Sequence, residues 1–419
     1  MTKGLRNVAK LMTGTAIGQA IALLAAPVLS RLYTPDEFGV VGVFLALASV
    51  LAVVSALRLE LAIVVPKEDD EALDIMATAL LVVGGFVLVA AVVLIFMAGP
   101  IAGWLGAPAV APLLGVLPLY VGLMGTFQVI NYWSTRNSRF GRLATAHVAR
   151  SVSTAATQAA LGAGGLGAAG MLAGQVTGQV LATATLLGRA ALGGSQVLRT
   201  KVSLAVTGGI IRRYSDFVAF GAPQALINAV SQSVPALVLT SAFGAGAAGQ
   251  FLLAQRVVTA PGNLLGQSLR QVLYPHLSRR LDDPKLQRFA INVTLGLAGL
   301  AVVPVVLLAT FGPSVFAWLF GEQWRLGGSF AGYLSLMFAM GLTNIPAMSL
   351  IPLLRMQRWH AGYEVVYLVV RVAALVVGGL LFGPIGAVAG YAFAGLVFNL
   401  VLIVVVLNRL RTWQLRNSA

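Results

Sequence analysis

The chain has 419 residues, of which 58% are hydrophobic and only 10% are charged. A typical soluble domain carries about 25% charged residues, so this composition excludes a water-exposed globule, and the mean hydropathy of +0.89 indicates a protein that lies in lipid. The net charge is +15, which in a membrane protein points to basic cytoplasmic loops rather than to a nucleic-acid partner. Cysteine is absent, which excludes disulfides, thiolate catalysis and Cys-ligated metal sites.

Twelve windows of about 20 mostly apolar residues, the length needed to cross a bilayer, follow one another along the chain. They lie near residues 11–30, 40–65, 75–99, 109–131, 143–163, 166–188, 216–242, 250–275, 289–311, 327–351, 361–381 and 385–407. The sequence therefore predicts an all-α polytopic membrane protein with about twelve transmembrane helices. The separation of the fifth and sixth windows is the least defined, because residues 162–170 are only Gly, Ala and Leu, and a fusion there would lower the count.

Basic residues fall almost entirely on one side of this pattern. If the N-terminus lies inside, 21 Lys and Arg fall in cytoplasmic segments and only Arg31 and Arg325 fall in the opposite loops. Cytoplasmic loops carry such an excess, so we predict an even number of spans with both termini in the cytoplasm. The first window is longer than the roughly 7–15-residue apolar region of a cleaved signal peptide, so we expect it to remain as a span.

The two halves of the chain share a weak repeat. Residues 29–40 resemble residues 239–250, and the order Gly-Pro then Trp-Leu occurs at residues 99–105 and again at 312–319. This repeat predicts two six-helix lobes, which we place at residues 1–190 and 216–419, with a cytoplasmic linker over 191–215. Repeated lobes around a site at the bilayer midplane are typical of secondary transporters.

Five arginines remain inside the predicted spans: Arg58, Arg150, Arg256, Arg270 and Arg371. A charge at mid-bilayer costs roughly 2.5–3.5 kcal/mol on the insertion scale, so such residues face a cavity or a partner rather than lipid. We therefore take all five as candidates for binding an anionic substrate. Arg58, Arg150 and Arg270 lie in the inner parts of their spans, where extension of the side chain to the head groups is an equal alternative.

Three titratable groups in or beside the spans are candidates for coupling transport to an ion: Glu60, Glu364 and His147. Glu364 lies two turns before Arg371 on one helix face, so an ion pair between them is the alternative to a binding role for Arg371. Arg58 and Glu60 are two positions apart and would not face each other on a helix. For His147, helix packing is the alternative to proton transfer.

Amide side chains follow two later spans. Gln224, Asn228 and Gln232 share one face of the seventh window, and Asn263 and Gln267 share one face of the eighth. We expect these side chains to solvate a polar substrate. The alternative is hydrogen bonding between helices, worth about 0.6–2 kcal/mol per contact. We recognise no catalytic group, metal-binding cluster, cofactor motif or phosphate-binding loop, so no cofactor and no direct use of ATP are expected.

Several motifs span the chain: SRLYTPDEFG at 30–39, RLELAIVVPK at 58–67, GQF at 249–251, QVLYP at 271–275, GEQW at 321–324 and RMQRW at 355–359. They resemble the patterns of bacterial oligosaccharide flippases, the polysaccharide transporters of the multidrug/oligosaccharidyl-lipid/polysaccharide exporter superfamily. The resemblance covers nearly the whole chain. It implies two six-helix bundles around a central cavity in the inner (plasma) membrane.

The resemblance also implies a function and partners. Such flippases move undecaprenyl-diphosphate-linked oligosaccharides by alternating access for O-antigen, capsule or exopolysaccharide assembly, so a lipid-linked oligosaccharide and membrane lipids are the expected partners. A polysaccharide polymerase and glycosyltransferases are further candidates. In the related lipid II flippases basic cavity residues bind the diphosphate, and Arg58 and Arg256 occupy comparable spans here.

Two other functions remain open. A cation-coupled multidrug exporter of the same superfamily would need buried acids, yet the first span has no carboxylate. A membrane glycan polymerase or ligase would need catalytic groups on an outward loop, for which the segment with Glu322, Trp324 and Arg325 is the one candidate. A scaffold that transports nothing would not explain five arginines within spans.

Overall fold

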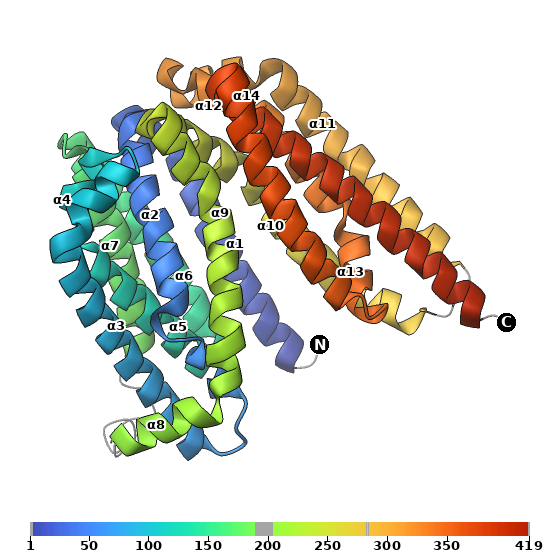
Figure 1. The fold of residues 1–419 in the computed structure, drawn as a ribbon, viewed down its shortest axis with the longest axis horizontal. Coiled ribbons are helices and arrows are strands. Elements are labelled where there is room, and N and C mark those ends of the chain that lie inside the picture. The colour runs from blue at the N-terminus through green and yellow to red at the C-terminus, as the bar shows by residue number, and fades with distance from the viewer. Residues whose placement is uncertain (1–2, 189–203, 282, 284, 418–419) are drawn as a thin grey trace. The chain divides into compact units, whose positions relative to one another are not determined.

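The computed structural model describes residues 3–188, 204–281, 283 and 285–417, and Figure 1 shows that every regular element in those ranges is helical. By packing, the chain divides into two compact units, Met1–Gly249 and Gln250–Ala419. Each unit is described by itself below.

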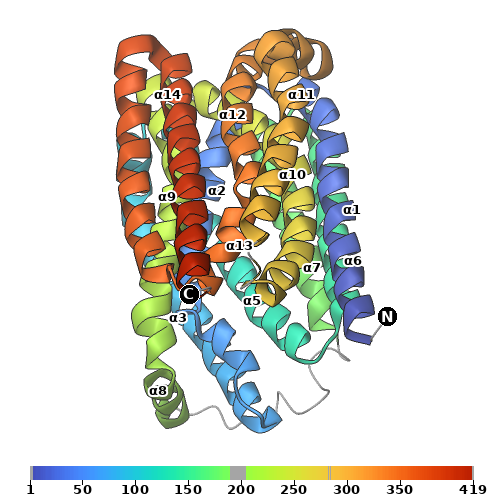
Figure 2. The same cartoon turned by 90° about the vertical axis from the view of Figure 1, so that its right-hand side faces the viewer.

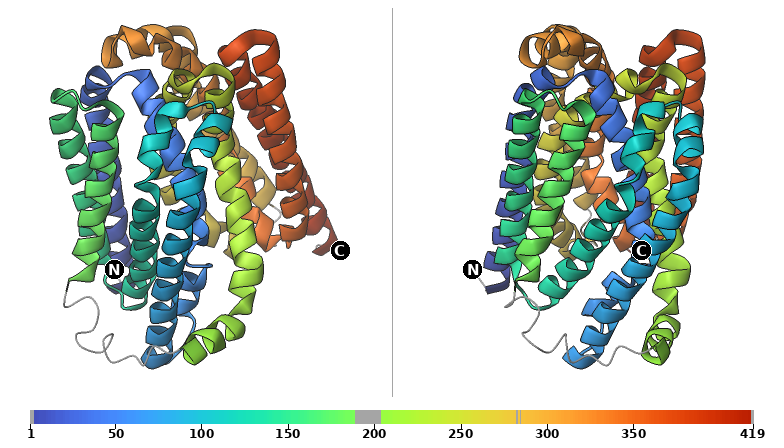
Figure 3. Two further views of the ribbon diagram at one scale, coloured as in Figure 1. Left: turned by 60° about the vertical axis from the view of Figure 1, so that its left-hand side comes forward. Right: turned by 90° about the vertical axis from the view of Figure 1, so that its left-hand side faces the viewer.

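The first unit consists of long helices joined by short turns, with one oblique helix at an end. Its elements are α1 (Lys3–Leu32), α2 (Pro35–Ser55), the 3₁₀ helix η1 (Leu59–Val64), α3 (Asp69–Trp104), η2 (Pro108–Val110), α4 (Ala111–Leu114), α5 (Leu117–Arg136), α6 (Phe140–Ala163), α7 (Gly167–Leu187), α8 (Leu204–Arg213), the π-helical turn η4 (Phe217–Gly221), α9 (Ala222–Phe243) and the start of α10 (Ala245–Arg279). Helix α6 packs against α1 and α7, and Figure 3 shows α6 and α7 side by side. Helix α8 lies across the end of α3 (Figure 1).

The second unit contains the rest of α10 and four further helices. These are α11 (Leu286–Phe320), α12 (Arg325–Thr343), α13 (Ile345–Leu353) and α14 (Gln357–Asn417), with the 3₁₀ turn η5 (Glu322–Trp324) before α12. Helix α14 consists of two limbs, because Phe382 and Gly383 leave the helical conformation and Gly383 takes φ +67°. Figure 2 shows the two limbs running alongside each other.

The twelve predicted windows each coincide with a helix, a pair of helical pieces or one limb of α14. Within the described residues, seven helices are long and apolar enough to cross a membrane, and the bent pair Pro108–Leu114 and Leu117–Arg136 adds an eighth. The longest of the seven stretches contains both limbs of α14. Helices α6 and α7 are separate, as predicted, because the chain turns at Gly164–Leu166, where Gly165 takes φ +72°.

The first motif, at residues 30–39, is a helix-start signal. Thr34 Oγ1 accepts a hydrogen bond from Glu37 N (3.3 Å), Glu37 Oε2 accepts one from Thr34 N (2.7 Å), and Pro35 occupies the first turn of α2. This reciprocal pair is a capping box. The preceding Tyr33 is buried, and its hydroxyl donates to the carbonyl of Gln158 at 2.7 Å. The motif thus fixes where α2 begins and ties it to α6.

The two segments that the repeat pairs, at the starts of α2 and α10, touch through glycine. A Cβ on Gly39 would lie 1.8 Å from Ala245 O, and a Cβ on Gly249 would lie 1.9 Å from Pro35 O. Any larger residue at either glycine would collide with backbone. The contact is reciprocal between equivalent positions of the repeat, which is a physical reason for glycine in both motifs.

Helix α9 packs against α2 inside the first unit, and the hydroxyls of Ser49 and Ser233 approach to 3.5 Å. The sequence repeat assigns α9 to the second lobe, so the boundary by packing follows α9 whereas the predicted boundary precedes it. The predicted division into residues 1–190, 191–215 and 216–419 stays a prediction.

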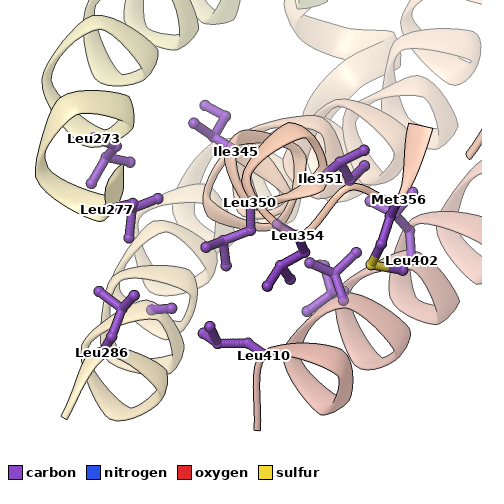
Figure 4. Packing of buried hydrophobic residues seen from close by; sticks show 14 of the residues in the cluster. Leu273, Leu277, Leu286, Ile345, Leu350, Ile351, Leu354, Met356, Leu402 and Leu410 are labelled. Carbon is purple, nitrogen blue, oxygen red and sulfur yellow. The ribbon is translucent and has the colours of Figure 1, made fainter. Parts of the chain in front are cut away.

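Each unit has its own apolar core. In the first, η1 is part of that core, since Leu59, Ala62 and Ile63 are fully buried with residues of α3 and α5. In the second, α10, α11, α13 and α14 enclose a cluster of leucine and isoleucine side chains that Figure 4 shows, among them Leu277 and Leu350.

Candidate functional site

Arg58 and Glu60 lie in the connection between α2 and α3, not within a helical span. Helix α2 ends at Ser55, and the chain then turns because Leu57 (φ +51°) and Arg58 (φ +62°) take the left-handed conformation. Our expectation that Arg58 and Glu60 would not face each other is therefore wrong. It assumed continuous helix, whereas this turn brings Arg58 Nη1 to 3.2 Å from Glu60 Oε1.

This ion pair is largely removed from water. The Glu60 side chain is 0% exposed and that of Arg58 is 24% exposed. Burial raises the pKa of the Glu60 carboxyl, and a backbone hydrogen bond and the Arg58 charge oppose that rise. A buried carboxylate with one cationic partner is poised to exchange that partner or take up a proton.

Arg371, at mid-span on the first limb of α14, is held by aromatic rings. Its guanidinium carbon lies 4.8 Å from the ring centre of Tyr367 and 4.9 Å from that of Tyr391, on the second limb. Both faces of a planar guanidinium can interact with rings. Glu364, the alternative partner for Arg371, has Oε1 3.3 Å from His360 Nε2, and an Arg371–Glu364 pair stays a prediction.

Tyr367 belongs to a row of aromatic side chains along the first limb of α14, which the sequence reasoning did not assign. Trp359, Tyr363, Tyr367 and Arg371 recur every four residues, so their side chains follow one helix face. The ring centres of Trp359 and Tyr363 are 5.1 Å apart, and Phe398 of the second limb stacks on Tyr367 at 5.0 Å. The four-residue spacing was a readable signal, but the partners on the second limb were not.

Two further candidate residues of the first unit, Arg150 and His147, lie on α6. Arg150 Nη2 lies 3.5 Å from the hydroxyl of the buried Tyr120, a long contact. His147 meets the ring of Phe127 edge to face at 5.8 Å. Both side chains of α6 therefore point to α5.

The amide residues of α9 form the predicted stripe. Gln224, Asn228 and Gln232 are all exposed, and Gln232 Nε2 donates to Asn228 Oδ1 at 3.0 Å. The opposite face of α9, which includes Ser233, packs against α2. The hydrogen bond of Gln232 therefore lies along its own helix.

On α10 the structure places two of the four predicted polar side chains. Arg256 is half-buried and Arg270 is exposed. The side chains of Asn263 and Gln267 lie outside the described part of the chain.

The loop considered for an enzyme carries a closed ion pair. Arg325 Nε and Nη2 donate to the two carboxylate oxygens of Glu322 at 2.5 and 2.9 Å. Trp324 between them is fully buried. The Glu322 carboxylate is thus engaged on both oxygens by its neighbour.

Another residue that sequence reasoning missed is Arg136, counted above only among the cytoplasmic loop cations. Its guanidinium contacts the connection between η1 and α3 through backbone carbonyls. No sequence signal reveals such a contact, because its acceptors are main-chain atoms.

Comparison with known proteins gives both a family and a fold. Residues 28–326 match the family described as "Polysaccharide biosynthesis protein". Over 338 residues the chain is 25% identical to the "Succinoglycan biosynthesis transport protein ExoT" of Rhizobium meliloti (strain 1021), covering 80% of this chain and 65% of that protein. The chain thus spans a little under two thirds of the length of this relative.

Two solved structures share the fold. The "Lipid II flippase MurJ, inward closed conformation" has a TM-score of 0.74 at 11% identity, covering 97% of this chain and 90% of that one. An inward-facing "multidrug resistance MATE family transporter of the MOP superfamily" has a TM-score of 0.72 at 16% identity, with full coverage of both chains. The likeness confirms the predicted all-α polytopic membrane fold of about twelve helices in two lobes.

Proposed function

The chain belongs to the family of polysaccharide biosynthesis proteins, and we propose that it is a flippase for an undecaprenyl-diphosphate-linked oligosaccharide. It acts in the bacterial inner membrane, with both termini in the cytoplasm, and serves the assembly of a surface polysaccharide. The relative's name, a biosynthesis transport protein, supports transport rather than catalysis. The motifs at 30–39 and 58–67 support the same family of flippases.

The observation that carries the proposal furthest is the buried Arg58–Glu60 pair. A diphosphate head group is an anion that arginine binds by charge-assisted hydrogen bonds. Opening of the pair with Glu60 frees Arg58 Nη1 for this anion. Because burial already raises the pKa of Glu60, proton uptake by this carboxyl is the step that releases Arg58, and it links substrate binding to protons.

The remaining candidate residues fall into two groups, one that binds the phosphate head group and one that contacts the sugars. Arg371, fixed by two rings, is a second site for a phosphate, and Arg150, Arg256 and Arg270 are weaker ones. The exposed amides of α9, with Asn263 and Gln267 of α10, solvate the glycan. The polyprenyl tail stays in lipid while the glycan crosses by alternating access. His147 and Glu364 are weaker candidates for coupling.

The cation-coupled multidrug exporter remains the second candidate, because the fold likeness to a multidrug transporter is nearly as close as that to the flippase. Glu60 would then be its cation site. Arg58 at 3.2 Å disfavours a cationic substrate there. For a glycan polymerase or ligase, the one candidate carboxylate, Glu322, is occupied by Arg325, which disfavours catalysis.

The proposal is tested with the purified chain in proteoliposomes. The probe is undecaprenyl diphosphate carrying a single fluorescently labelled N-acetylglucosamine, whose outer-leaflet fraction is measured by quenching with membrane-impermeant dithionite. Efflux of a cationic dye is measured in parallel. We expect protein-dependent translocation of the glycolipid without dye efflux. Dye efflux without translocation would establish the exporter instead.

A further inference from the structure

Arg136, the last residue of α5, holds the connection that leads from η1 into α3. Its side chain is 12% exposed, and its guanidinium nitrogens make six hydrogen-bonding contacts with one short stretch of chain, some of them sharing a hydrogen. The acceptors are the carbonyl oxygens of Ile63 (3.2 Å), Pro66 (2.5 Å), Lys67 (3.2 Å) and Glu68 (3.1 Å), and Oδ1 of Asp69, which receives both Nε (3.1 Å) and Nη2 (3.0 Å).

This arrangement requires arginine. A guanidinium presents five N–H donors in a rigid plane, so it can satisfy several acceptors that converge on one point. A lysine has three donors on one flexible tip and cannot reach the same set. Four of the acceptors are backbone carbonyls, so the contact fixes the path of the main chain rather than the orientation of one side chain.

The same connection carries Arg58 at its other end. Only η1 separates Arg58 from the clamped stretch, and Leu59 and Ile63 of η1 are fully buried. Leu57 and Arg58 hold a left-handed backbone that residues with a Cβ rarely adopt. Such a conformation persists only when the surrounding structure over-determines it. The buried residues fix the middle of the connection, and Arg136 fixes its exit.

We propose that Arg136 is a positioning residue for Arg58: by clamping residues 63–69 it fixes the backbone from which Arg58 reaches a phosphate-bearing lipid. The proposal rests on the function proposed above. It gives Arg136 a role beyond the contribution of its charge to topology. Replacement by lysine separates the two roles, because Arg136→Lys keeps the positive charge and loses the clamp.

The first measurement tests the clamp itself. The chain has no cysteine, so Val65→Cys, at a side chain 56% exposed, takes a single spin label without background. We expect Arg136→Lys to increase the mobility of this label. Arg212→Lys, at an exposed position of α8, is the matched control and is expected to leave the mobility unchanged. Unchanged mobility in Arg136→Lys would overturn the clamp.

The second measurement tests the link to Arg58 with the fluorescent undecaprenyl-diphosphate sugar in proteoliposomes. We expect Arg136→Lys to raise the KM for this lipid about tenfold, with the maximal rate within about twofold of the parent, and Arg212→Lys to match the parent. In an Arg58→Gln background, Arg136→Lys should add nothing. A full, additive effect of Arg136→Lys in that background would show that it acts elsewhere.

The outcomes separate this proposal from the function on which it rests. An Arg58→Gln variant with raised KM beside a normal Arg136→Lys variant contradicts the positioning role alone. An unaffected Arg58→Gln variant contradicts the proposed site and the positioning role together. If Arg136→Lys does not fold, Asp69→Asn replaces it. Asp69 is 74% exposed, and losing its charge weakens the contact with Arg136. A smaller rise in KM is expected for Asp69→Asn, and an unchanged KM would overturn the proposal.

Discussion

The two best-placed arginines of this protein are held by opposite chemistry. In the first unit Arg58 pairs with the buried carboxylate of Glu60 on an irregular connection. In the second unit Arg371 lies against the rings of Tyr367 and Tyr391, which come from the two limbs of α14. The first guanidinium is paired with an anion, whereas the second contacts aromatic rings.

The two arginines are therefore expected to bind an anionic head group under different conditions. We propose that protonation of Glu60 frees Arg58 Nη1 for phosphate, so the affinity of Arg58 for the lipid is expected to depend on pH. Tyrosine rings do not titrate near neutral pH. We therefore expect binding at Arg371 to vary little with pH and binding at Arg58 to vary strongly.

Neutralising either arginine should have the largest effect. Hydrogen bonds to charged groups contribute about 1.5–3 kcal/mol each, which corresponds to roughly ten- to 150-fold in affinity. We expect Arg58→Gln and Arg371→Gln each to lower translocation of the lipid-diphosphate sugar by this factor at limiting substrate. Arg212→Gln, on an exposed face of α8, serves as control. A normal rate in either variant would remove that residue from the site.

Glu60→Gln should remove the pH dependence of lipid affinity that we expect from Arg58 and leave binding at Arg371 unchanged. Burial raises the pKa of Glu60, and its protonation frees Arg58, so affinity for the lipid in the parent should rise as the pH falls through that pKa. Glu60→Gln mimics the protonated form, so its affinity should be high and independent of pH. Titrating the KM between pH 5 and pH 8 measures this, with the exposed Glu68→Gln as control. A parent profile retained by Glu60→Gln would assign the pH dependence to another group.

Removing a ring beside Arg371 should have a smaller effect. A cation–π contact contributes about 0.5–2 kcal/mol depending on desolvation, or roughly two- to 30-fold. We expect Tyr391→Leu to raise the KM within this range and Tyr391→Phe, which keeps the ring, to change it little. If both variants behave alike, the hydroxyl or the packing of Tyr391 matters rather than its π face.

The α9 stripe should give the smallest effect, and one that depends on the glycan. A net hydrogen bond is worth about 0.5–1.5 kcal/mol, so Gln232→Ala should slow translocation of a multi-sugar lipid roughly two- to tenfold. The single-sugar probe should be unaffected, because it lacks the sugars that these amides would solvate. An equal loss with both lipids would indicate a role in helix packing instead.

Much of the fold was predictable, because it depends on local pattern. Apolar length located all twelve windows, and the turn residues around Gly383-Pro384 located the break within α14. The Thr34–Glu37 capping box is likewise a local pattern, because its two residues lie three positions apart in the sequence. Glycine at positions 39 and 249 was visible as a repeat, although the contact between the two segments was not.

The sites were less predictable, because their decisive features are not local. The left-handed backbone at Leu57 and Arg58 involves no glycine, so the sequence gives no signal for it. A helical geometry was therefore assumed, and the pairing of Arg58 with Glu60 was not predicted. Arg371 offered a charged neighbour at Glu364 in sequence, yet its partner Tyr391 comes from the second limb of α14. The packing of α9 against α2 likewise depends on tertiary structure.

The central proposal is that arginine side chains of this protein recognise the diphosphate of a lipid carrier. It is tested most directly by comparing one fluorescent sugar on two carriers, undecaprenyl diphosphate and an uncharged diacylglycerol, in the same proteoliposomes. The parent protein should translocate the diphosphate-linked sugar much faster, and the Arg58→Gln, Arg371→Gln double variant should bring the ratio of the two rates close to one. A ratio unchanged by the double variant would contradict the account.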